Sequence, residues 1–140
     1  MKKETYDFAV KRKYHDELTR FIANFHTKRK NKARLKVICF PGHEALEIFN
    51  VYDKLEIPRK NIVGIERDPK IITELKQRNL GIELYESSDI EFFEQTTERF
   101  DVINLDYQTY MNTEIAYALA LIFGKPNNPI VKDKAIVGIN

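Results

Sequence analysis

The residues best suited to chemistry in this sequence are acids that stand directly after short apolar runs. Glu66 follows the run at 62–65, and Asp106 follows the run at 100–105. Asp89 stands after two serines that follow a third apolar run. Carboxylates accept hydrogen bonds strongly from hydroxyl and amino groups, so acids grouped at strand ends can hold a sugar or a base.

Each acid has two interpretations. Glu66 comes 24 residues after Gly42, where a carboxylate can accept both hydroxyl hydrogens of a ribose; the alternative is a solvated acid. Asp89 can accept from the exocyclic amine of a base, or cap the helix that the Ser88 and Glu91 spacing predicts. Asp106 can hold a substrate amine or accept a proton, or be a solvated or capping acid.

The turn after the first apolar run is poor in glycine. Gly42 allows a ligand to approach the backbone closely, but it is the one glycine of the turn, and the preceding Pro41 removes a backbone donor. A dinucleotide fingerprint has three glycines at fixed spacing. The turn therefore argues against a pyrophosphate ligand such as NAD or FAD. Tyr107, beside Asp106, can stack on a base or a methyl donor.

Other kinds of site lack a signal. The three histidines have no metal-ligand spacing, and there is no Gly-Lys-Ser/Thr phosphate loop or nucleophilic serine motif. The single cysteine, Cys39, cannot form an intramolecular disulfide. No apolar run reaches the roughly 18 residues of a membrane helix, and no signal peptide is recognised. We expect a cytoplasmic protein.

The elements that must position these residues alternate along the chain. Apolar runs predict strands at 35–40, 62–65, 82–85, 100–105 and 135–139. Helical spacing or capping residues predict helices at about 45–55, 69–79, 88–93 and 113–123. This order predicts an α/β fold with a Rossmann-like parallel sheet of about five strands and helices on both faces. Its ligand crevice would lie at the carboxyl ends of the first, second and fourth strands.

The N-terminal segment is predicted to be separate from this domain, with a helix and basic linker at 1–34 and the domain at 35–140. A helix at about 4–26 is indicated by apolar residues three and four positions apart, and their stripe is expected to dock on the domain. The stripe comprises Tyr6, Val10, Tyr14, Leu18, Phe21 and Phe25. Residues 1–36 hold 12 Lys and Arg against 4 Asp and Glu, whereas the remainder holds 11 against 17. The basic segment can bind nucleic acid or be a solvated helix face.

From about Leu35 to Asn140 the chain resembles the class I S-adenosylmethionine-dependent methyltransferases. Residues 37–45 look like their first motif, a strand entering a glycine turn, and 62–69 resemble the second, whose acid holds the ribose of the methyl donor. Residues 88–90 resemble the third motif, which meets the adenine. Residues 100–107 resemble the fourth, a strand ending in an acid beside the transferred methyl. Two departures stand out: the family's turn has two or three glycines, and its sheet has about seven strands.

The resemblance implies S-adenosylmethionine as cofactor and methyl transfer to an acceptor. The basic N-terminal segment makes nucleic acid the first expectation for that acceptor. Glu66 would hold the ribose, Asp89 the adenine amine, and 40–44 the methionine end. Asp106 and Tyr107 would border the methyl. The implied cofactor-binding residues are Phe40, Pro41, Gly42, His43, Glu44, Glu66, Arg67, Ser88, Asp89, Ile90 and Asp106.

Two alternatives to this enzyme stay open. One is a non-catalytic module on the same scaffold that binds nucleic acid or a protein partner, which the glycine-poor turn and short sheet favour. The other is a nucleotide-binding enzyme of another Rossmann type. The short sheet has three explanations: the last two strands are absent, the chain is a fragment of a longer protein, or a partner completes the sheet, because a fifth strand at an open edge invites pairing.

Overall fold

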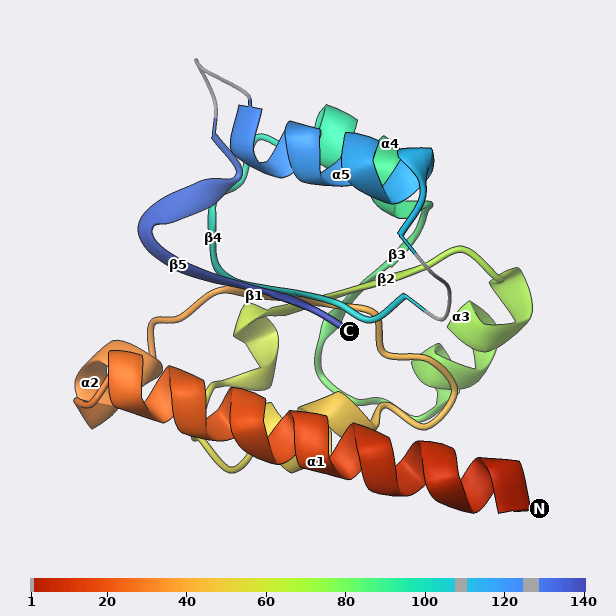
Figure 1. Cartoon of the computed structure of the whole chain (residues 1–140), viewed down its shortest axis with the longest axis horizontal. Helices are drawn as coiled ribbons and strands as arrows, with labels where there is room; N and C mark the ends of the chain where they lie inside the picture. The colour runs from red at the N-terminus through yellow and green to blue at the C-terminus, as the bar shows by residue number, and fades with distance from the viewer. Residues whose placement is uncertain (1, 108–110, 125–128) are drawn as a thin grey trace.

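The computed structural model describes residues 2–107, 111–124 and 129–140. Its elements alternate as expected after an N-terminal helix (Figure 1). In chain order they are α1 (Lys2–Phe25), α2 (Arg29–Lys32), β1 (Val37–Cys39), the π-helical turn η1 (Ile48–Tyr52), the 3-10 turn η2 (Arg59–Asn61), β2 (Ile62–Glu66), α3 (Pro69–Gln77), β3 (Glu83–Glu86), α4 (Asp89–Gln95), β4 (Phe100–Leu105), α5 (Thr113–Gly124) and β5 (Val131–Ile139).

The five strands form one parallel sheet in the order β3-β2-β1-β4-β5. The chain winds outward in one direction through β2 and β3, then crosses back to β4 on the other side of β1. Strand order therefore reverses between β1 and β4, which is where open α/β sheets open a crevice at the strand carboxyl ends. The Rossmann-like fold is confirmed.

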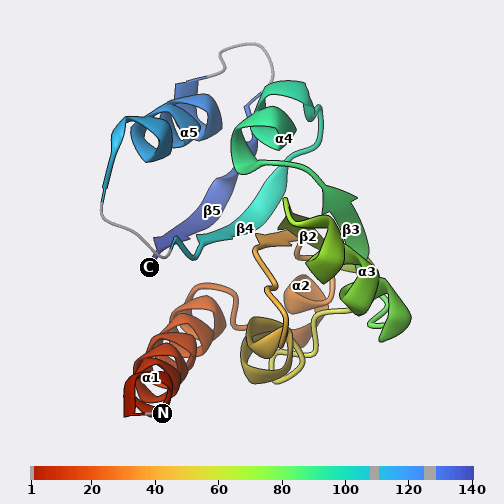
Figure 2. The same ribbon diagram turned by 90° about the vertical axis from the view of Figure 1, so that its right-hand side faces the viewer.

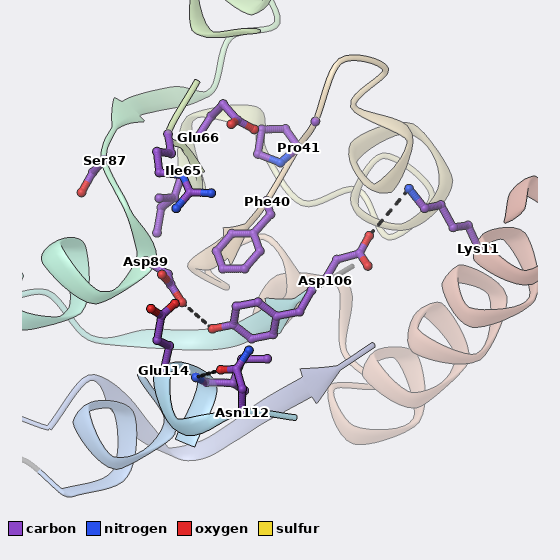
Figure 3. Close-up of a pocket in the computed structure, with 14 residues that line it drawn as sticks. Lys11, Phe40, Pro41, Ile65, Glu66, Ser87, Asp89, Asp106, Asn112 and Glu114 are labelled. Atoms are coloured by element: carbon purple, nitrogen blue, oxygen red, sulfur yellow. Dashed lines mark hydrogen bonds and ion pairs between the residues drawn. The ribbon is translucent and has the colours of Figure 1, made fainter. Parts of the chain in front are cut away.

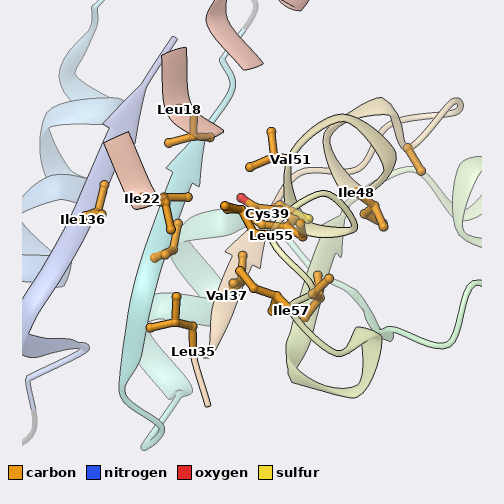
Figure 4. Close-up of a cluster of buried hydrophobic side chains, with 14 of the residues drawn as sticks. Leu18, Ile22, Leu35, Val37, Cys39, Ile48, Val51, Leu55, Ile57 and Ile136 are labelled. Atoms are coloured by element: carbon orange, nitrogen blue, oxygen red, sulfur yellow. The ribbon is translucent and has the colours of Figure 1, made fainter. Parts of the chain in front are cut away.

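Two apolar cores lie on the two faces of the sheet. Figures 1 and 2 show α4 and α5 over one face and α1 over the other. Side chains alternate along β1 because successive residues of a strand point to opposite faces. Val37 and Cys39 join the core under α1 (Figure 4), and Ile38 joins the core under α4 and α5. All three are fully buried, so β1 is the central strand of the sheet.

Three helices begin at the carboxyl edge of the sheet, each with a side-chain cap. The Asp68 carboxylate accepts from Lys70 N at 2.9 Å and starts α3, with Pro69 in the first turn. Ser88 Oγ accepts from Glu91 N at 3.1 Å and starts α4. Asn112 Oδ1 accepts from Ile115 N at 2.9 Å before α5. These caps confirm the predicted helix starts and fix how the helix ends surround the crevice.

The prediction for the face of α1 is partly wrong. Leu18 is buried as expected, but the helix packs on the sheet through Leu18 and Ile22, while Phe21 is 61% and Phe25 48% exposed. Adjacent helix positions differ by about 100° in direction, so Phe21 points well away from Ile22. Val10 is also exposed. The side chain of Tyr6 lies outside the described part of the chain.

The predicted helix at 45–55 is present but shorter, over 46–52, and its part Ile48–Tyr52 is π-helical. Ala45 adopts a left-handed φ of 56°, and Asp53 N donates to Ile48 O at 2.9 Å, a π-type bond. This segment brings the Tyr52 hydroxyl to the buried carboxyl group of Glu47, to which it donates. Asn104 of β4 donates to the same carboxyl group at 2.6 Å.

This buried polar network extends to α1. The Tyr14 hydroxyl donates to Asn104 Oδ1 at 2.6 Å and so joins α1 to β4. A Cβ at Gly138 of β5 would stand 2.6 Å from the Tyr14 hydroxyl and 2.7 Å from Asn104 Oδ1. The close approach of three elements at this point therefore requires glycine.

Strand β5 begins earlier than the predicted 135–139. Val131 pairs with Phe100, and Ile136 pairs with Val102, so the strand bulges between these two contacts. Lys132 Nζ binds Asp101 Oδ2 at 3.0 Å within the bulge. A bulge bends an edge strand and makes it a poorer template for further pairing. Among the helices of the described ranges, none is long and apolar enough to cross a membrane.

Candidate functional site

A crevice of about 500 Å³ lies at the carboxyl edge of the sheet, at the reversal of strand order (Figure 3). Its size falls within the roughly 300–1,000 Å³ of small-molecule sites. Residues from the ends of β1, β2 and β4 form most of its wall. It is lined by Lys11, Phe40, Pro41, Gly42, Ile65, Glu66, Arg67, Ser87, Asp89, Asp106, Tyr107, Asn112, Glu114 and Ile115.

The ends of β2 and β4 place Glu66 and Asp106 in this one crevice. Figure 3 shows them on either side of Phe40, which comes from the end of β1. Glu66 Oε1 accepts from Asp68 N at 3.0 Å, so the loop before α3 orients its carboxylate. The shared hollow expected from parallel strand ends is present.

Asp106 is oriented from two directions. Asn140 Nδ2 donates to Asp106 Oδ1 at 3.3 Å, and Lys11 Nζ of α1 lies 4.0 Å from Oδ2. Backbone bonds from Tyr107 N to Asn140 O and from Asn140 N to Leu105 O continue the pairing of β4 with β5 to this point. The side chain of Asp106 is 17% exposed, enough to meet a ligand in the crevice.

Tyr107 holds Asp89 across the crevice wall. Its hydroxyl donates to Asp89 Oδ2 at 2.6 Å, and its ring meets the Phe40 ring edge to face at 5.5 Å between centroids. Burial raises the pKa of Tyr107, and the bond to the Asp89 carboxylate raises it further. Tyr107 is therefore a hydrogen-bond donor here, not a proton acceptor.

The turn after β1 carries an unobstructed glycine. Gly42 has a left-handed φ of 63°, and a Cβ added to it would meet nothing within 4 Å. The backbone there is open to the crevice. Pro41 is buried against β2, where a Cβ at Gly64 would lie 3.1 Å from Pro41 Cγ. Gly64 thus gives the proline turn room to lie over β2.

The crevice is acidic. Its described lining contains four acids, Glu66, Asp89, Asp106 and Glu114, against the two cations Lys11 and Arg67. Such a lining favours a cationic ligand and opposes a phosphate. Among the described residues no group of three or more His, Cys, Asp or Glu side chains is placed to hold a metal ion.

Four residues expected at the site lie outside the crevice lining. His43 is exposed, and its Nδ1 lies 2.8 Å from Glu74 Oε2. Glu44 is also exposed. Ser88 caps α4, while Ile90 packs against the core under α4 and α5. Their predicted contacts with a ligand stay predictions.

Sequence reasoning missed six residues of the lining: Lys11, Ile65, Ser87, Asn112, Glu114 and Ile115. Ser87 is the neighbour of the predicted Ser88, and Ile65 precedes Glu66. Asn112 directly precedes the predicted helix at 113–123, and Glu114 and Ile115 belong to the first turn of that helix. Lys11 gave no signal, because its spacing says nothing about where α1 crosses the sheet.

No protein-family model matches the sequence, and no curated protein matches it at the sequence level. Solved structures match its fold. HI0767 from Haemophilus influenzae, assigned as a methylase, has a TM-score of 0.65 and 17% identity, covering 89% of this chain and 78% of its own. YhhF from Escherichia coli, assigned as a methyltransferase, has a TM-score of 0.65 and 14% identity, covering 89% and 66%.

A third structure comes from Staphylococcus aureus and is assigned as a caffeoyl-CoA O-methyltransferase. Its TM-score is 0.61 at 14% identity, covering 91% of this chain and 56% of its own. Because the sequence identities are this low, the similarity to these structures shows a shared fold and nothing more. The chain has a class I methyltransferase-like fold, as its four sequence motifs implied.

Proposed function

We propose that the protein binds S-adenosylmethionine in the crevice and transfers its methyl group to an acceptor. The observation that carries this proposal is the meeting of Glu66 and Asp106, from the ends of β2 and β4, in one acidic crevice at the reversal of strand order. The methyltransferase-like fold of the structural neighbours supports it.

The residues fit this donor better than a dinucleotide. Glu66 accepts the ribose hydroxyls, and the Asp89 carboxylate, held by Tyr107, accepts the adenine amine. The open backbone at Gly42 meets the methionine end. A sulfonium cation suits the acidic lining, whereas the pyrophosphate of NAD would face four carboxylates.

The bound donor supplies a methyl carbon on a sulfonium: an acceptor lone pair bonds to this carbon while the carbon–sulfur electron pair stays on sulfur. The protein orients the two partners, which is the main way in which an enzyme speeds such a displacement. Asp106, fixed by Asn140 and Lys11, takes the proton when the attacking group carries one.

Nucleic acid is the proposed acceptor class, and the cytoplasm the proposed location. The excess of Lys and Arg in residues 1–36 supports a polyanionic acceptor. The second candidate function is a non-catalytic module on this scaffold. One specific feature favours it. The turn proposed to bind the methyl donor has a single glycine, next to Pro41, and therefore offers few backbone N–H groups.

Calorimetric titration separates these functions. We expect S-adenosylmethionine and S-adenosylhomocysteine to bind with one site per chain, and NAD to give no heat. Absence of heat at millimolar S-adenosylmethionine would rule out the enzyme. Donor binding without transfer of a labelled methyl group to RNA, DNA or protein from a cell extract would favour the non-catalytic module.

A further inference from the structure

The turn that carries Gly42 contains two residues in the left-handed region. The φ angle is 63° at Gly42 and 56° at Ala45. Glycine adopts this conformation freely, whereas a residue with a Cβ adopts it rarely and only where the surrounding structure holds it. The contacts that hold this turn therefore decide where the backbone of Gly42 stands in the crevice.

The protein core holds both ends of the turn but not its middle. Pro41 and Ala45 are buried, and Ala45 N donates to Pro41 O at 3.1 Å. Between them, His43 and Glu44 are exposed. The outer side of the turn, next to Gly42, therefore depends on contacts with another element.

Helix α3 provides these contacts. Arg78, the residue that ends α3, donates from Nη1 to His43 O at 2.8 Å. Glu74 Oε2 of the same helix lies 2.8 Å from His43 Nδ1, but both side chains are more than half exposed, so this pair contributes little. The bond from the charged guanidinium acts directly on the backbone of the turn, and bonds of this kind are stronger than neutral ones.

An aromatic ring keeps the exposed Arg78 side chain close to the turn. Arg78 Cζ lies 5.8 Å from the centre of the Phe49 ring, and Arg59 Cζ lies 5.0 Å from the same centre. Aromatic faces attract guanidinium groups. Because Phe49 belongs to η1, the two arginines join η1 to the segments on either side of α3.

The other end of α3 orients Glu66. Asp68 caps the helix, and its backbone N donates to Glu66 Oε1 at 3.0 Å. One short helix therefore connects the carboxylate proposed to hold the ribose with the turn proposed to meet the methionine end. Both groups would contact the same donor molecule, so their spacing matters for its binding.

We propose that Arg78 is a positioning residue of the donor site: through His43 O it holds the turn so that the Gly42 backbone meets the methionine end. The inference rests on the proposed binding of S-adenosylmethionine. Arg78 is not among the described residues that line the crevice, so it acts through the turn. Its loss should affect ligands that carry the methionine end and spare ligands that lack it.

Calorimetry on the full chain compares S-adenosylhomocysteine with 5′-methylthioadenosine, which lacks the amino-acid part, at a temperature where each variant stays folded. In Arg78→Ala we expect the affinity for S-adenosylhomocysteine to fall about tenfold and that for 5′-methylthioadenosine to change less than about twofold. Arg78→Lys keeps a charged donor and should recover part of the loss.

Arg59→Ala is the matched control. Its guanidinium lies on the same Phe49 ring, while its hydrogen bonds within the described part of the chain go to Asp53 and Leu80. Both affinities should stay close to those of the wild type. In spectra of the ligand-free, ¹⁵N-labelled chain, Arg78→Ala should shift or broaden the Gly42 amide signal, and Arg59→Ala should leave it in place.

Three results would overturn the proposal: equal loss of affinity for the two ligands in Arg78→Ala, equal effects of Arg78→Ala and Arg59→Ala, or an unchanged Gly42 amide in Arg78→Ala. Failure of the wild-type chain to bind S-adenosylhomocysteine would instead overturn the proposed function. The ligand-free spectra would then still show whether Arg78 holds the turn.

Discussion

The hydroxyl of Tyr107 donates to the carboxylate of Asp89 at 2.6 Å, and both residues line the crevice. Tyr107 follows β4, and Asp89 begins α4, which follows β3 at the far edge of the sheet. The bond therefore joins two walls of the crevice that are distant in the sheet. It fixes the direction of the Asp89 carboxylate, which we propose accepts from the amine of a bound adenine.

Removal of this hydroxyl should weaken binding of the methyl donor and reduce discrimination between bases. In Tyr107→Phe we expect the affinity for S-adenosylhomocysteine to fall by about fivefold, the equivalent of about 1 kcal/mol for one lost hydrogen bond. Discrimination against S-inosylhomocysteine, which lacks the adenine amine, should fall too. Calorimetry measures both.

Tyr117→Phe is the matched control for this experiment. The Tyr117 hydroxyl donates to Glu94 Oε1 at 3.1 Å, an exposed tyrosine–carboxylate pair outside the crevice lining. An equal loss of affinity in the two variants would show that Tyr107 does not act through Asp89.

Gly42 should tolerate no side chain if the donor approaches its backbone. Gly42→Ala places a Cβ in the open space of the crevice and keeps a left-handed φ, at a cost of about 1 kcal/mol in stability. We expect donor affinity to fall more than tenfold in titrations at a temperature where the variant stays folded. Gly124→Ala, where a Cβ also meets nothing within 4 Å, serves as control. Normal affinity in Gly42→Ala would move the donor away from this turn.

Glu47 should make stability fall with rising pH. Burial raises its pKa from 4.5 to about 8, outweighing the hydrogen bonds from Tyr52 and Asn104, which act the other way. Above pH 4.5 the unfolded chain loses this proton while the folded chain keeps it. The free energy of unfolding should therefore drop by about 1 kcal/mol per pH unit up to about pH 8.

Urea unfolding at pH 5, 6, 7 and 8 checks this slope. Glu47→Gln removes the titrating group and should flatten the profile over the same range. If the wild-type and variant profiles remain parallel, the Glu47 carboxyl does not hold its proton in the folded protein.

Gly138 should resist substitution for steric reasons alone. In Gly138→Ala the new Cβ collides with the Tyr14 hydroxyl and the Asn104 side chain. We expect a loss of roughly 1–3 kcal/mol in unfolding free energy, the usual cost of overpacking. Adding Tyr14→Phe should recover part of it, because one of the two colliding atoms is gone. A stable Gly138→Ala protein would mean that α1 does not pack against β5 as described.

The alternation of strands and helices along the chain and the helix starts could be predicted because they depend on local chemistry. Dense apolar runs mark buried parallel strands, and Asp68, Ser88 and Asn112 carry the capping oxygens that begin their helices. The acids Glu66 and Asp106 could be placed together because parallel strands end at the same edge of a sheet.

What could not be predicted depends on how distant elements pack. The stripe of α1 was misjudged because Phe21 and Phe25 are as apolar as Leu18, and spacing does not tell which side meets the sheet. Glu47 and Asn104 are polar, yet both are buried, and the hydrogen bond between their side chains satisfies polar atoms of both. The position of Lys11 in the crevice lining could not be predicted either, because it depends on how α1 packs against the sheet.

Binding of S-adenosylhomocysteine to Glu66→Ala, followed by calorimetry, tests the central claim most directly. The Glu66 carboxylate, held toward the crevice by Asp68 N, should provide the ribose contact. Its loss should weaken binding by about 2 kcal/mol, or roughly 30-fold. Glu83→Ala, an exposed acid at the opposite end of β3, should bind like the wild type. Full affinity in Glu66→Ala would contradict a nucleoside site at the ends of these strands.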